Sequence, residues 1–142
     1  MPLARTILAG LAWLFLTLVA VQVFLAGVAL FGAGTFDGHI GFGYLLAMVP
    51  LVVLIACWPA RPGRTVVWLS VALLVVTQVQ TFLPLFRDDL PVVAALHPVN
   101  ALAIFWLGLT IARRATALAR ATSDAPEARQ RVNPADRASS AT

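Results

Sequence analysis

The sequence predicts an all-α integral membrane protein, a four-helix bundle made of two tandem, parallel-oriented helical hairpins. Three observations lead to this prediction. The chain contains long apolar segments without charge, its arginines alternate between successive connections, and a glutamine–histidine pattern occurs twice. Of 142 residues, 61% are hydrophobic and only 11% are charged, which is not the composition of a soluble domain.

Four segments of 22 to 31 residues carry no charge: 6–36, 38–60, 65–86 and 90–112. At about 1.5 Å per helical residue, each can cross a hydrocarbon core of about 30 Å. Lipid offers no hydrogen bonds, so each crossing must be helical. We predict membrane spans at about 7–31, 39–58, 65–86 and 91–112, within a transmembrane domain of residues 1–115. A signal peptide is disfavoured for the first segment, because no cleavage site of small residues precedes a polar stretch.

Local signals predict where these helices begin and bend. Asp37 is expected to cap the second helix, and Asp88 or Asp89 the fourth, where Pro91 suits the first turn. Prolines inside the spans predict kinks, or a helix restart after His97, because proline cannot donate a backbone hydrogen bond. These prolines are Pro50, Pro84 and Pro98.

The arginines predict the orientation in the membrane. Six of them precede the first span, join the second to the third, or follow the fourth: Arg5, Arg61, Arg64, Arg113, Arg114 and Arg120. The other two connections carry Asp37, and Arg87 beside Asp88 and Asp89. The positive-inside rule therefore predicts a multi-pass plasma membrane protein with both termini in the cytoplasm. The net charge of +4 needs no nucleic-acid partner, and residues 116–142 have the composition of a disordered cytoplasmic tail.

An internal repeat relates the two halves of the chain. Val21, Gln22, Phe24 and Leu25 stand 58 residues before Val79, Gln80, Phe82 and Leu83, and His39 stands 58 residues before His97. These are the chain's two histidines, and each follows its glutamine by 17 residues. Each copy is then a hairpin, and both histidines should lie at the same height on the outer side.

The paired histidines are the candidate site. Two equivalent imidazoles facing each other across a four-helix bundle suit the two faces of a heme, so we predict His39 and His97 as axial ligands of heme b. The alternative is that each histidine only reaches the membrane interface. Zinc and copper are less suited, because two histidines do not fill such a site and the nearest acids are predicted caps.

Other residues near the histidines are candidate cofactor contacts. Gly43 and Ala101 lie one helical turn after the histidines, where a small residue leaves room for a flat macrocycle. Both residues also suit ordinary membrane helix packing. Asn100, matched by Phe42 in the first copy, would add a polar contact on one side only. Gln22 and Gln80 are predicted to form interhelical hydrogen bonds, or alternatively to contact the cofactor or a substrate.

The two hairpins together resemble one four-helix half of the heme A synthase family. The resemblance rests on VQVFLAG with His39, and on VQTFL with LHPVNAL around His97. The pattern is also similar to that of small four-helix membrane proteins that share Q-V-F-L-A-G…H…L-H-P-x-N-A-L. The resemblance implies a b-type heme held by two histidines. However, Ile40 stands where the family often has arginine, and the first helix holds no acidic residue.

The sequence thus predicts a small membrane b-type cytochrome that transfers electrons or handles heme near the outer face. Besides the lipid bilayer, its partner would be a redox protein or a quinone. A homodimer would restore the eight-helix arrangement of the heme A synthase family. Two alternatives remain: a heme-free accessory or interaction protein, and a small enzyme acting on heme or quinone. We expect no enzymatic activity from this chain alone.

Overall fold

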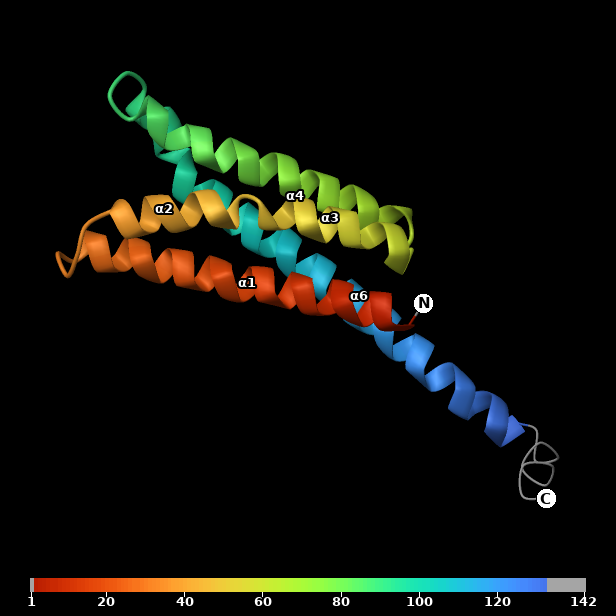
Figure 1. Ribbon diagram of the computed structural model, residues 1–142. Helices are drawn as coiled ribbons and strands as arrows, with labels where there is room; N and C mark the ends of the chain where they lie inside the picture. The colour runs from red at the N-terminus through yellow and green to blue at the C-terminus, as the bar shows by residue number, and fades with distance from the viewer. Residues whose placement is uncertain (1, 133–142) are drawn as a thin grey trace.

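A computed structural model describes residues 2–132, with side chains described as far as residue 124. Within this part the chain is helical and contains no strand (Figure 1). Its elements are α1 (Pro2–Leu30), α2 (Asp37–Leu46), α3 (Val49–Ala60), α4 (Arg64–Phe82), the 3₁₀ helix η1 (Leu83–Phe86), α5 (Pro91–Ala94) and α6 (Leu96–Val132). They make four spans that are long and apolar enough to cross a membrane: Pro2–Leu30, Asp37–Ala60, Arg64–Phe86 and Pro91–Asp124. The predicted four-helix membrane bundle of two tandem hairpins is confirmed.

Three of the spans are interrupted where proline predicted a bend. The second span breaks between α2 and α3, two residues before Pro50, and the third tightens into η1 around Pro84. The fourth restarts at Leu96, which places Pro98 in the first turn of α6. A proline is tolerated there because the first backbone amides of a helix have no intrahelical partner.

The predicted acidic caps are wrong. Phe36 is the N-cap of α2 and makes no side-chain hydrogen bond, while Asp37 lies within the first turn and accepts a bond from the Thr35 hydroxyl at 2.7 Å. Leu90 is the N-cap of α5, again without a side-chain bond, so neither Asp88 nor Asp89 caps it. In both cases the helix begins one or more residues away from the position that capping requires. Pro91 does occupy the first turn of α5.

The helix that contains the fourth span runs past the predicted end of the membrane domain. α6 continues to Val132, so residues 116–132 of the predicted tail are helical. The stretch after Arg114 is rich in alanine, the strongest helix former, and it continues the hydrogen-bonding ladder of the span. Residues 133–142 lie outside the described part of the chain.

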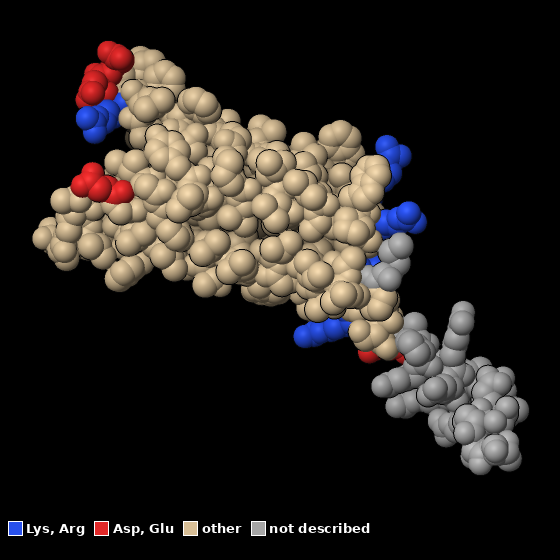
Figure 2. All heavy atoms as spheres, viewed as in Figure 1, with Lys and Arg blue, Asp and Glu red and all other residues tan. Residues whose placement is uncertain are grey.

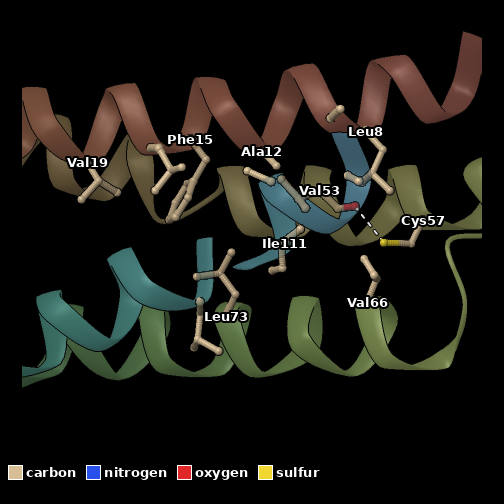
Figure 3. Packing of buried hydrophobic residues seen from close by; sticks show 14 of the residues in the cluster. Leu8, Ala12, Phe15, Val19, Val53, Cys57, Val66, Leu73 and Ile111 are labelled. Atoms are coloured by element: carbon tan, nitrogen blue, oxygen red, sulfur yellow. Dashed lines mark hydrogen bonds between the residues drawn. The ribbon is translucent and has the colours of Figure 1, made fainter. Parts of the chain in front are cut away.

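The core lies between α1, α3, α4 and α6, and α1 packs most extensively on α6. Figure 3 shows side chains from all four helices pointing toward one another. Large and small residues alternate in this cluster, which lets the helices approach closely. Its labelled members are Leu8, Ala12, Phe15, Val19, Val53, Cys57, Val66, Leu73 and Ile111.

The two ends of the bundle differ in charge. Basic side chains gather at the end that holds both the N-terminus and the α3–α4 turn, and acidic ones are found mainly at the opposite end (Figure 2). We call these the arginine end and the histidine end. The arginine end holds Arg5, Arg61 and Arg64, and the histidine end holds Asp37 and the turn 87–90.

The two ends also differ in packing. Neither 20–45 nor 84–103 contains a buried residue, whereas buried residues recur along α1 from Leu8 to Val19 and along α6 from Ile104 to Ala115. The tightly packed core therefore occupies the arginine end and the middle of the bundle. The histidine end is more loosely packed.

Candidate functional site

The structure brings the two histidines together at the histidine end. His39 lies in the first turn of α2 and His97 in the first turn of α6, so each comes from a different hairpin. Their ring centroids are 6.1 Å apart, with an angle of 69° between the ring planes. Both residues are half-buried, and the ring of Phe36 stands edge-on to His39 with its centroid 6.1 Å away. The predicted pairing of His39 with His97 is thus present in the fold.

Each histidine is joined to the glutamine of its own repeat by two hydrogen bonds that run in opposite directions. The imidazole Nδ1 of His39 donates to the Gln22 carbonyl oxygen at 3.1 Å, and the Gln22 amide nitrogen donates to the His39 carbonyl oxygen at 2.8 Å. In the second repeat, His97 donates to the Gln80 carbonyl at 3.1 Å and receives a bond from the Gln80 amide at 2.9 Å. We call this arrangement the His–Gln clasp. The glutamines therefore form the predicted interhelical hydrogen bonds, with the histidines themselves as partners.

The clasp fixes the tautomer of both rings. A backbone carbonyl can only accept a hydrogen bond, so the proton of each neutral imidazole must lie on Nδ1. This leaves the lone pair on Nε2, the nitrogen through which a histidine held in this way binds a metal. The Gln22 amide nitrogen also lies 3.4 Å from Nε2 of His39, which is a long contact.

Gly43 makes room for the clasp of the first repeat. A Cβ atom at this position would stand 2.7 Å from the Gln22 amide nitrogen, closer than real Cβ contacts occur. The space predicted for a macrocycle beside Gly43 is therefore filled by the Gln22 side chain. Ala101, its counterpart in the second repeat, is half-buried on α6.

Asn100 makes the two clasps unequal, as its lack of a counterpart in the first repeat predicted. Its side-chain nitrogen donates to Gln80 Oε1 at 2.7 Å and to the Val76 carbonyl oxygen at 3.0 Å. Phe42 occupies the matching position and cannot donate a hydrogen bond. Consequently Gln22 Oε1 is buried without a hydrogen-bond partner. The polar contact of Asn100 is made with the protein, and it secures the amide of Gln80.

Gln78 does not belong to this site. Its side-chain nitrogen donates to the carbonyl oxygen of Ala47 at 2.9 Å, at the break between α2 and α3. Gln78 and Gln80 therefore point to different neighbours, as expected for residues two apart on a helix. The role of Gln78 could not be read from the sequence, because it depends on which carbonyl the break leaves unpaired.

The spacing of the two imidazoles suits a heme iron, whereas the space beside Gly43 is occupied by the Gln22 side chain. A metal between two imidazole nitrogens, each bonded at about 2 Å, places the ring centroids on the order of 6 Å apart, close to the observed separation. Both rings carry an unprotonated Nε2, and that of His39 also receives the long contact from the Gln22 amide. Within the part of the chain that the structure describes, no three histidine, cysteine or acidic residues are grouped as ligands for one metal ion. A two-histidine site thus suits iron that a macrocycle already coordinates better than it suits a bare ion.

The fold and the site define a multi-pass helical membrane protein whose two hairpins carry matching His–Gln clasps. Among known families, the chain matches the model of a family of unknown function, DUF6220, over residues 22–85. The matched stretch contains the first clasp and Gln80, and ends before His97. No curated protein and no solved structure matches the chain. The resemblance to heme A synthases stays a prediction.

Proposed function

We propose that the protein is a small membrane b-type cytochrome that binds one heme between His39 and His97, for electron transfer or heme handling. The observation that carries this proposal is the pair of matching clasps, which present two Nε2 atoms from opposite hairpins. A single histidine near a helix end could simply reach the membrane interface. Two histidines that face each other, each held in the metal-binding tautomer, form a ligand pair.

The chain's own residues would set the properties of the site. His39 and His97 would hold the heme, and the carbonyl groups of Gln22 and Gln80 would fix the orientation of the two rings and raise their basicity. The apolar surroundings would limit water access, which is one of the means by which proteins adjust a redox potential. When bound, heme would supply a one-electron iron couple.

The charge distribution supports an orientation for this site. With the arginine end in the cytoplasm, as the positive-inside rule favours, both termini are cytoplasmic and the site lies in the outer half of the bilayer. Its electron-exchange partner would then be an outward-facing redox protein or a membrane quinone.

The decisive experiment is an absorption spectrum of the protein purified in detergent, recorded before and after reduction with dithionite. We expect the narrow bands of a six-coordinate, low-spin b-type heme, in the preparation itself or after hemin is supplied. His39→Ala and His97→Ala should each abolish these bands. Ile40→Ala is the matched control, because Ile40 is the next residue of α2 and its side chain is exposed.

Two outcomes would contradict the proposal. A preparation that stays colourless after hemin is supplied would indicate a heme-free interaction protein. Low-spin bands that survive in either histidine variant would show that the replaced histidine is not a heme ligand. Circular dichroism of each variant must show native helix content, so that loss of the bands is not mistaken for loss of the fold.

A further inference from the structure

A groove at the arginine end, remote from the histidines, has the features of a lipid site. It has a volume of about 850 Å³ and runs along the outer side of α3 and α4. Leu54 and Val67 line it, together with Trp58 and Trp68, whose side chains are 88% and 65% exposed. From Leu54 to Arg61 it follows about 10 Å of helix, at 1.5 Å per residue, which is most of the acyl region of one leaflet.

The mouth of the groove is positively charged. Arg61 and Arg64 both line it, and no acidic residue does. Among side chains of residues 2–124, neither arginine forms an ion pair; the salt bridge found there joins Arg87 to Asp88 at the other end. Arginine binds phosphate groups through two parallel hydrogen bonds, which suits it to a phospholipid headgroup.

Arg61 is held in an unusual backbone conformation. It ends α3 with φ 47° and ψ 58°, the left-handed region that glycine adopts without strain. For a residue with a Cβ atom this conformation costs about 1–2 kcal/mol. The turn therefore carries an arginine at a position where glycine would stabilise the fold more.

We propose that this groove binds an anionic phospholipid of the surrounding bilayer. Its acyl chain would lie between Trp58 and Trp68, and its phosphate would contact Arg61 and Arg64. Tryptophan at a membrane interface also serves as a general anchor, and arginine as a general determinant of orientation. Here an apolar groove is lined by two arginines without an ion pair, and one of the two, Arg61, is held in a strained conformation. The proposal does not depend on heme binding.

The test measures which lipid contacts the groove tryptophans. Trp13 and Trp106 are replaced by phenylalanine, so that fluorescence reports only Trp58 and Trp68. The protein is reconstituted in vesicles that contain phosphatidylcholine and phosphatidylglycerol at equal mole fraction. In one sample the phosphatidylcholine carries brominated acyl chains, and in the other the phosphatidylglycerol does. Bromine quenches indole fluorescence on contact. We expect brominated phosphatidylglycerol to quench more strongly. Each arginine should account for about a fivefold preference, since a basic residue near an anionic surface contributes roughly 1 kcal/mol.

Variants separate a lipid site from general attraction to a charged surface. Arg61→Gln combined with Arg64→Gln should abolish the preference, while Arg113→Gln, on α6 and outside the groove, should preserve it. Arg61→Gly should raise the melting temperature and yet weaken the preference, which no loss of folding can imitate. Equal quenching by the two lipids in the parent protein, or a preference that survives the double substitution, would overturn the proposal.

Discussion

Each histidine of this protein is oriented by two hydrogen bonds to the glutamine of its own repeat, which leave the imidazole lone pair on Nε2. The clasp takes up Nδ1 and the backbone carbonyl of the histidine, and the glutamine donates through its amide and accepts through its own carbonyl. The second clasp is completed by Asn100, which bonds Gln80 Oε1. The first clasp lacks this partner, so Gln22 Oε1 stays unpaired. An unpaired buried acceptor is costly, so the first clasp should be the less stable of the two.

Gly43→Ala tests the first clasp at the scale of a single methyl group. Alanine favours a helix over glycine by up to about 1 kcal/mol, but here the added Cβ displaces the Gln22 amide from His39. The matched control is Gly41→Ala, where a Cβ meets nothing within 4 Å. We expect the Gly43 variant to be less stable than the Gly41 variant by about 1 kcal/mol, the net worth of one hydrogen bond.

Equilibrium unfolding in mixed detergent micelles measures this difference. In a Gln22→Ala background the two glycine variants should become equally stable, because no amide is left to displace. A difference in stability that persists in that background would show that Gly43 makes room for a group other than the Gln22 amide.

At the scale of elements, interruptions of the spans give this bundle its shape. Pro50 lacks the amide that would continue the helix, so α2 and α3 are separate elements within one span. The broken ladder leaves the Ala47 carbonyl without its usual partner, since Leu51 donates to Met48 instead. Gln78 of the neighbouring hairpin fills this vacancy. A backbone group freed by proline inside a membrane span must be satisfied in such a way.

Pro50→Ala should make Gln78 dispensable. In the parent protein we expect Gln78→Leu to lower stability by about 1 kcal/mol, because it leaves the Ala47 carbonyl unpaired in an apolar environment. With Pro50→Ala the helix can continue and Leu51 can donate to Ala47, so the same leucine substitution should cost little. A double-mutant cycle on unfolding free energies gives the coupling directly. Additive effects of the two substitutions would contradict this account of the break.

At the scale of the whole molecule, packing and charge are distributed along the same axis. The arginine end is tightly packed, basic and holds the start of α1, whereas the histidine end is loosely packed and carries Asp37, Asp88 and Asp89 (Figure 2). Tight packing at one end holds the helices in register.

The proposed orientation can be tested by cysteine labelling in intact cells. Cys57 is buried and is first replaced by alanine. A cysteine introduced in place of Asp89, at the exposed histidine end, should react with a membrane-impermeant maleimide added from outside. A cysteine replacing Ser123, exposed on α6 beyond the arginine end, should react only after permeabilisation. The reverse pattern would place the histidines in the cytoplasmic half.

The sequence by itself determined the properties that depend on local chemistry. Apolar length defined the four spans, proline placed the breaks, and the repeat paired His39 with His97. Only the tertiary structure decided which groups meet: that Gly43 faces the Gln22 amide, that Gln78 serves the Ala47 carbonyl, and that Asp37 caps nothing. The physical reason is that helical periodicity assigns a residue to a face, whereas hydrogen-bond partners depend on the relative shift and rotation of neighbouring helices. Those are set by the packing of the whole core.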